Sequence, residues 1–176
     1  MQENVNATSS DSEKHSRLID SRSDFHAAIR EAFASLAASA CNDLVICDTD
    51  FADWPLGEIS VIDSLTQWVR PHRKLTVYAQ NFDDVLRRHS RWVTWRRQFA
   101  HAVECRVVEP LEQGRMPVLF TARGAQVGCM TVRLFDASRY RGTLSTDARD
   151  AVLAREQIDA ISQRSAEGFP ATTLGL

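Results

Sequence analysis

Three aspartates follow a short apolar run in the first third of the chain. The run 44–47 (Leu-Val-Ile-Cys) ends in Asp48, Asp50 and Asp53, and residues 54–57 (Trp-Pro-Leu-Gly) then form a turn sequence. Closely spaced carboxylates can transfer protons, attack phosphorus or bind a divalent cation. In open α/β sheets, ligands bind beyond the carboxyl ends of the strands. We therefore expect a ligand site where this strand ends.

The Asp48-Thr49-Asp50 spacing resembles that of the haloacid dehalogenase-type phosphatases. In that family the first Asp attacks phosphorus and the second acts as acid and base, which here implies a metal-dependent phosphatase or phosphodiesterase using Asp48 and Asp50. Ala52 stands where the family has Thr, and the following predicted strand ends in Ala79-Gln80 rather than in Ser or Thr. Catalysis is therefore kept as an alternative, and turn capping by Asp is preferred.

Composition indicates one globular domain with a substantial core. The chain has 176 residues, of which 44% are hydrophobic, and a formal net charge of −2. A net-acidic chain has no overall attraction for nucleic acid or anionic membranes. No apolar run approaches the ~20 residues of a membrane helix, and no apolar leader begins the chain. We predict a cytoplasmic protein with no membrane association.

The charge is unevenly distributed. Residues 43–63 carry six acidic side chains and no Lys or Arg, whereas residues 87–101 carry five arginines and no acid. An Arg87–Arg97 helix could bind nucleic acid, with Trp92 and Trp95 as stacking platforms. Helical spacing of the aromatic residues instead favours a Trp face in the core and a solvated Arg face. Nucleic acid is therefore the least favoured partner, kept as a second alternative.

The four cysteines show no Cys-x-x-Cys spacing, and each lies in or beside an apolar run. We predict buried free thiols, with no disulfide and no zinc site. His89 and His101 are too far apart in sequence to share one helical face, so no metal is predicted. Phosphate-binding glycine loops and dinucleotide fingerprints are absent from the sequence, and no cofactor is predicted.

Hydrophobic periodicity and turn residues predict alternating helices and strands. Ser21 and Asp24 have the spacing of a helix cap, which starts the first helix. Helices are predicted at about 23–39, 59–69, 82–89, 91–101 and 146–163, and strands at 43–48, 74–80, 103–107, 117–121 and 126–134. The domain prediction is a disordered tail over 1–22, an α/β domain over 23–163 and an extended tail over 164–176. This order predicts an α/β fold whose sheet has parallel and antiparallel parts flanked by helices.

The order of these elements is similar to a single repeat of the phospholipase D-like fold. Active members carry His-x-Lys, four residues, Asp and then Gly. With Gly124 placed on that Gly, Met116 takes the His position, Val118 the Lys position and Arg123 the Asp position. Neither Met nor Val can attack phosphorus, so the resemblance implies a degenerate, non-catalytic scaffold lacking the HxKxxxxD motif.

More closely, the chain resembles an uncharacterised bacterial domain of this fold that occurs alone or fused to an N-acetyltransferase domain. The likeness is carried by the residues at 44–57, 88–91, 99–101 and 172–176. It implies a fold without an assigned activity. Single repeats of this fold commonly pair, so it also implies that a homodimer could form.

These observations lead to a functional prediction. We expect a cytosolic binding or regulatory module for an anionic small molecule or a protein partner. Its candidate cleft is lined by Asp48, Asp50, Asp53, Trp54 and Arg123, the last of which would bind an anion in place of a former catalytic aspartate.

Overall fold

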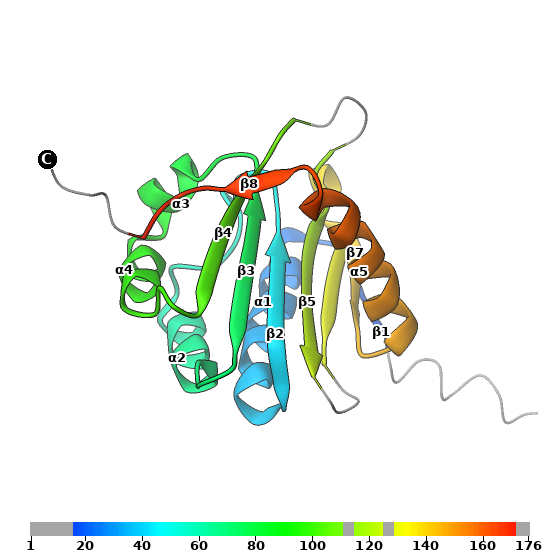
Figure 1. Ribbon diagram of the computed structural model, residues 1–176. Coiled ribbons are helices and arrows are strands. Elements are labelled where there is room, and N and C mark those ends of the chain that lie inside the picture. The colour runs from blue at the N-terminus through cyan, green and yellow to red at the C-terminus, as the bar shows by residue number, and fades with distance from the viewer. Residues whose placement is uncertain (1–15, 111–114, 125–128, 172–176) are drawn as a thin grey trace, which may run out of the picture.

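The computed structural model describes residues 16–110, 115–124 and 129–171. They form one eight-stranded mixed sheet with helices on both faces (Figure 1). The sheet order is β1-β7-β6-β5-β2-β3-β4-β8. The strands are β1 (Ser16–Ile19), β2 (Cys41–Cys47), β3 (Lys74–Ala79), β4 (Val103–Val108), β5 (Val118–Gly124), β6 (Thr131–Asp136), β7 (Arg141–Ser145) and β8 (Ser165–Glu167). The predicted mixed sheet flanked by helices is confirmed.

The centre of the sheet is parallel and its flanks are antiparallel. β2 pairs with β3 and β3 with β4 in parallel, and helical crossovers join each pair. β5 runs antiparallel to β2, and β6, β7 and β1 continue that side. The short β8 closes the other edge against β4. The carboxyl end of β2 therefore lies beside the amino end of β5.

The helices are α1 (Arg22–Ala38), α2 (Ile59–Trp68), α3 (Asp83–Arg88), α4 (Ser90–Gln98) and α5 (Ala148–Ser162). The predicted cap of α1 is confirmed, because Ser21 Oγ accepts a hydrogen bond from the Asp24 backbone N–H at 3.0 Å. α2 buries Val61, Leu65 and Trp68. Its first residue, Ile59, is 62% exposed, so the buried face of α2 begins at Val61.

Two apolar layers hold the sheet between the helices. On one face, α1 contributes Phe33, whose ring lies edge-on to Phe120 of β5 at 5.1 Å. On the other face, Ile158 and Ile161 of α5 pack in a cluster with Leu119 of β5. Because Leu119 and Phe120 are consecutive, they point to opposite faces of the strand. Figure 1 shows α5 in front of the sheet and α1 behind it.

α5 covers only part of its face. It contacts β5 and β6, and in Figure 1 β2, β3 and β4 lie beside it with no helix of the described residues in front of them. This leaves a partly open sheet face along one flank of α5. The opposite face is covered more fully, by α1 and α2, with α4 packed against α2.

Three strands were missed in the sequence analysis. β1 lies within the predicted disordered tail of residues 1–22, and β8 within the predicted extended tail; residues 1–15 and 172–176 are outside the described part. No element was predicted over the residues of β7, which pairs with both β6 and β1. Short strands whose side chains are half polar have no clear periodicity of their own, and their partners stabilise them.

The prediction of four free thiols was wrong for one pair. Cys41 and Cys129 form a disulfide with their Cα atoms 6.4 Å apart, while Cys47 and Cys105 are free and buried. Their separation of 88 residues hides this proximity in the sequence. In the described part of the chain, no helix has the length and apolarity required to cross a membrane.

Candidate functional site

Asp48 follows β2 directly, and its carboxylate is held by the loop that it begins. The oxygens of Asp48 accept hydrogen bonds from the Thr49 backbone N–H at 2.5 Å and from Trp54 Nε1 at 2.6 Å. Burial raises the pKa of Asp48 to about 6, although these hydrogen bonds favour the charged form. Asp48 is therefore a weaker acid than an ordinary aspartate, with both oxygens already bonded inside the protein.

The other two aspartates of the loop are also engaged within the protein. Asp50 Oδ1 accepts a hydrogen bond from the Ala52 backbone N–H at 2.9 Å, as a turn cap does. Asp53 accepts hydrogen bonds from Arg22 Nη2 at 3.0 Å and from the Tyr140 hydroxyl at 2.8 Å. These contacts account for the three carboxylates as structural groups of the loop.

Two histidines fasten this loop to the helices around it. His26 Nε2 of α1 donates to the Asp53 carbonyl at 2.7 Å, and His89 Nε2 donates to the Phe51 carbonyl at 2.9 Å. Burial lowers the pKa of His89, which favours its neutral form. Sequence reasoning considered His89 only as a zinc ligand, and no local pattern marks its contact with a residue far away in the chain.

The space at the aspartates is small. A cavity of about 80 Å³ lies between Asp48, Asp50, Asp53, Phe25 and Tyr140, well below the ~300 Å³ at which small-ligand sites begin. Trp54, predicted to line a cleft, is 2% exposed and packs edge-on against Phe25. Among the described residues, no group of three or more His, Cys, Asp or Glu side chains is arranged to hold a metal ion.

Arg123 does not belong to this site. It lies on β5 opposite Asp43 and forms an ion pair with that carboxylate. Since β5 runs antiparallel to β2, position 123 is level with the start of β2, whereas Asp48 follows its end. The expectation that the five residues line one cleft is therefore wrong: the structure brings Asp48, Asp50, Asp53 and Trp54 together and places Arg123 at the other end of the sheet.

The arginine-rich segment folds as α3 and α4, but not all of its arginines are exposed to solvent. Arg96 is 4% exposed, donates through Nη2 to the Phe169 carbonyl and lies over the Phe169 ring at 4.5 Å. Trp92 and Trp95 are 0% and 4% exposed, so neither can serve as a stacking platform. Arg88 pairs with Asp84 one turn earlier. The predicted Trp-inward packing is confirmed, and the prediction that Arg96 is solvated is wrong.

The exposed residues of α4 share one face. At 100° per residue, Ser90, Arg91, Thr94, Arg97 and Gln98 fall within about one third of the helix circumference. All five are exposed, and α4 has no acidic residue. We name this set the α4 polar face. Four of them, all except Arg97, line a shallow cavity of about 360 Å³ with Ile62 and Thr66 of α2.

The charge of the α4 polar face is not cancelled by the acidic segment. Among the described residues, no carboxylate lies within ion-pair distance of Arg91 or Arg97, and Arg91 Nη1 donates only to the Gly57 carbonyl at 3.2 Å. The acids of the preceding loop pair instead with α1, through Arg22–Asp53 at 3.0 Å and Arg30–Glu58 at 2.6 Å. Arg91 and Arg97 therefore stay available to an external anion.

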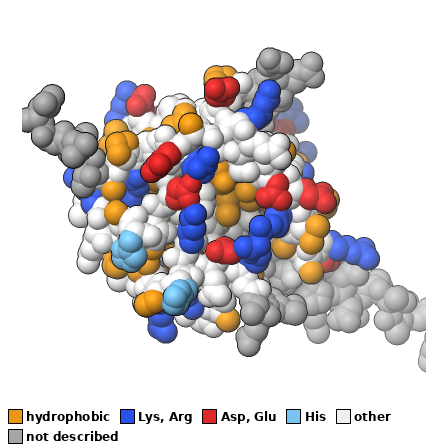
Figure 2. Space-filling model, viewed as in Figure 1, with side chains coloured by type: hydrophobic (Ala, Val, Ile, Leu, Met, Phe, Trp, Pro, Cys, Tyr) orange, Lys and Arg blue, Asp and Glu red, His pale blue; other side chains and the backbone are white. Residues whose placement is uncertain are grey.

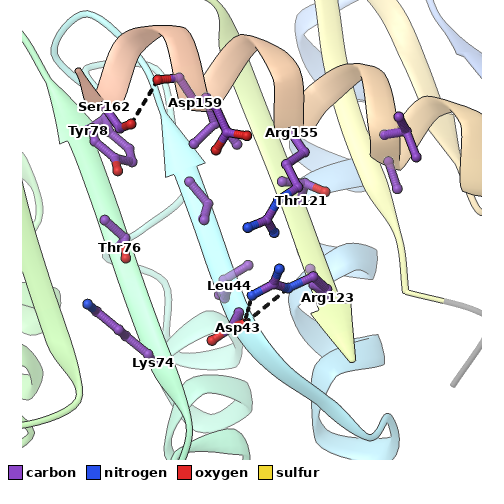
Figure 3. Close-up of a pocket in the computed structure, with 15 residues that line it drawn as sticks. Asp43, Leu44, Lys74, Thr76, Tyr78, Thr121, Arg123, Arg155, Asp159 and Ser162 are labelled. Atoms are coloured by element: carbon purple, nitrogen blue, oxygen red, sulfur yellow. Dashed lines mark hydrogen bonds and ion pairs between the residues drawn. The ribbon is translucent and has the colours of Figure 1, made fainter. Parts of the chain in front are cut away.

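A third hollow lies on the open sheet face beside α5 (Figure 3). It has a volume of about 420 Å³, with β2, β3 and β5 as its floor and α5 as its wall. We name it the α5 groove. Figure 2 shows hydrophobic side chains at the base of a hollow on this face, with acidic and basic side chains around them. No sequence pattern pointed to its wall residue Arg155 or its floor residue Tyr78. The floor residues become neighbours only through the pairing of β2, β3 and β5.

The comparisons with known proteins give a structural likeness and no likeness in sequence. No family model and no curated protein matches this chain. A solved structure of TrmBL2, described as an archaeal chromatin protein with a novel mode of DNA binding, is similar with a TM-score of 0.60 and 11% sequence identity. The match covers 94% of this chain and 56% of TrmBL2, so the chain spans little more than half of that protein. At this identity the likeness establishes a shared fold.

This finding corrects the functional prediction. The preferred prediction was a module for an anionic small molecule or a protein partner, with nucleic acid least favoured. The similar solved structure is instead described as that of a DNA-binding chromatin protein, which contradicts this order of preference. The predicted cleft is also not formed, because Arg123 lies apart from the aspartates. The nucleic-acid alternative fits these findings better.

Proposed function

We propose that this protein binds nucleic acid through the α4 polar face. The observation that carries the proposal is the composition of that face: two arginines, two hydroxyl residues and one amide, all exposed and without a carboxylate. These are the side chains that most often contact nucleic-acid phosphates. Arg87 is a further exposed arginine, in the last turn of the preceding α3.

The same surface indicates how binding would work. Trp92 and Trp95 are packed in the core, so α4 offers no aromatic ring for an unpaired base. Arginine and hydroxyl contacts to phosphate position a nucleic acid without reading its sequence. We therefore expect binding by α4 to be independent of sequence and strongly weakened by salt. The likeness to TrmBL2, a DNA-binding protein, makes duplex DNA the first ligand to test.

The test is fluorescence anisotropy of a labelled 20-base-pair duplex with the double variant Arg91→Gln/Arg97→Gln. We expect its affinity to fall about tenfold or more at low salt, and the slope of log K against log salt to fall by about 2, because two phosphate contacts are lost. The matched control is Arg149→Gln/Arg164→Gln, which removes two exposed arginines, one in the first turn of α5 and one just after its end. Equal losses in both variants, or no binding by the wild type at low salt, would refute the proposal.

We further propose that the scaffold is a single phospholipase D-like repeat, related to the bacterial domain that it resembles, whose reactive residues have been replaced. Two observations support this. Met116 and Val118, at the positions of the motif His and Lys, are 4% and 7% exposed and belong to apolar clusters. Arg123, at the position of the motif Asp, is held by Asp43. Buried apolar side chains at these positions supply no nucleophile.

A further inference from the structure

The floor of the α5 groove changes character in three steps along the strands. Strand register places Lys74, Asp43 and Arg123 in one row across β3, β2 and β5, and Thr76, Val45 and Thr121 in the next. In the third row only Tyr78 lines the groove, and its register neighbours Cys47 and Leu119 do not. The groove is therefore charged at one end, hydroxyl-bearing in the middle and aromatic and apolar at the other.

At the charged end of the groove, one cationic side chain remains free to bind a ligand. Asp43 is paired with Arg123, and Lys74 with Glu104 of β4. Figure 3 shows Arg155 extending from α5 toward Arg123. Among the described residues, no carboxylate lies within ion-pair distance of Arg155. Two guanidinium groups thus approach one another in a groove that also holds two carboxylates, Asp43 on the floor and Asp159 on α5. A phosphate could bridge the two guanidinium groups.

The other end of the groove suits a flat ring with polar edges. Val45 on the floor and Ile158 on the wall are apolar, and Tyr78 lies where Figure 3 also places Ser162. Within the described part of the chain, neither the Tyr78 hydroxyl nor the Thr76 hydroxyl has a hydrogen-bond partner. Burial raises the pKa of Tyr78, so this hydroxyl keeps its proton at neutral pH and can donate it in a hydrogen bond.

We propose that the α5 groove binds one unpaired nucleotide of a nucleic-acid strand, with its phosphodiester at Arg155 and Arg123 and its base between Val45, Tyr78 and Ile158. The groove volume of about 420 Å³ lies within the ~300–1,000 Å³ range of small-ligand sites. A base that is stacked and paired in a duplex cannot enter such a pocket, whereas an unpaired base can. The inference rests on the proposed nucleic-acid function but assigns a second site, on the opposite face of the sheet from α1 and α2.

The test compares three labelled probes at one ionic strength: a twelve-nucleotide dT strand, the same length with its central positions abasic, and a matched duplex. The dT and abasic strands carry equal phosphate charge, so their difference reports the base alone. We expect the wild type to bind the dT strand about tenfold more tightly than the abasic one, consistent with stacking and hydrogen bonding of one base.

Arg155→Gln tests the groove, and Arg149→Gln is the matched control on the same helix, since both side chains are exposed. We expect Arg155→Gln to lower the affinity for the dT strand about tenfold, as for loss of a charged hydrogen bond. Its affinity for the duplex should stay within twofold of the wild type. Arg149→Gln should change neither by more than twofold. Thr76→Val, on the half-buried floor, should weaken the dT strand without affecting the duplex.

The outcomes separate the two proposals. Equal affinity for the dT and abasic strands, or equal effects of Arg155→Gln and Arg149→Gln, overturns the groove assignment while duplex binding by α4 stands. Binding of the dT strand through Arg155 without any duplex binding supports the proposal for the α5 groove and refutes the proposal that the α4 polar face binds nucleic acid. Failure to bind all three probes refutes both.

Discussion

Asp48 is a candidate catalytic residue by its sequence pattern, but in the structure it stabilises a loop. Its spacing with Asp50 resembles that in haloacid dehalogenase-type phosphatases. Its oxygens, however, accept hydrogen bonds from the Trp54 indole N–H and the Thr49 backbone N–H. Asp53 is held in the same way by Arg22 and Tyr140. Carboxylates that close a loop around a buried tryptophan are already bonded, so a substrate would have to displace those hydrogen bonds.

Asp48 should make stability depend on pH. Its pKa of about 6 in the folded protein exceeds the ordinary value of 3.8, so the folded state binds the proton more tightly. The resulting stabilisation is fully present below about pH 4 and is lost as the pH rises through about 6, a change of up to about 3 kcal/mol. In Asp48→Asn this dependence should vanish, as measured by urea unfolding of both proteins at pH 4 and pH 7.5.

The stability difference between Asp48→Asn and wild type is the informative quantity, because other groups titrate equally in both. It should shift in favour of the variant as the pH rises. Parallel pH profiles for the two proteins would show that Asp48 keeps an ordinary pKa in the fold.

At the scale of secondary-structure elements, the arginines of α4 have two roles, one at the surface and one in the core. Its outward face carries Arg91 and Arg97, and its inward face carries Trp92, Trp95 and Arg96. Arg96 and Arg97 are neighbours in sequence, but a helix turns each residue by 100°, which points one into the protein and the other into solvent. The buried guanidinium binds the segment after β8 through Phe169, whose ring also stacks on Phe82 at 4.7 Å.

Substitution of these two arginines should separate the roles. Arg96→Ala removes a buried hydrogen bond and the contact with the Phe169 ring, and should lower the free energy of unfolding by about 2 kcal/mol. Arg97→Ala, at an exposed position, should change it by no more than about 0.5 kcal/mol. Urea unfolding monitored by tryptophan fluorescence measures both. A similar small effect for the two variants would show that the Phe169 contact adds nothing to stability.

At the scale of the whole molecule, sheet order decides which distant segments meet. β5 inserts between β2 and β6, so residues near positions 41, 123 and 129 gather at one end of the sheet. The disulfide between Cys41 and Cys129 ties that end together across 88 residues. The same order puts β3, β2 and β5 side by side and thereby builds the floor of the α5 groove.

The disulfide should contribute substantially to stability. A cross-link spanning about 90 residues restricts the unfolded chain, and its loss should cost roughly 4 kcal/mol. We expect dithiothreitol to lower the urea midpoint of the wild type and to leave the Cys41→Ser/Cys129→Ser variant unchanged, with the variant close to the reduced wild type. A wild-type midpoint that does not respond to the reductant would show that the two thiols are not linked in solution.

Local pattern was enough to predict the main helices and central strands. Ser21 marked the start of α1, and the spacing of Trp92 and Trp95 correctly indicated their inward packing. Strands such as β1 and β8 could not be predicted, because four and three residues carry no period and depend on hydrogen bonds to β7 and β4. For the candidate site, the sequence grouped the aspartates with Trp54 correctly but added Arg123, whose position depends on the direction of β5.

By itself, then, the sequence determined the alternation of helices and strands, the apolar faces and the two segments of opposite charge, since these depend on neighbours within one or two turns. The tertiary structure alone decided which charges remain unpaired, which cysteines meet and which side chains line the α5 groove. Those properties depend on strand order and register, which join residues far apart in the chain and leave no local trace in its sequence.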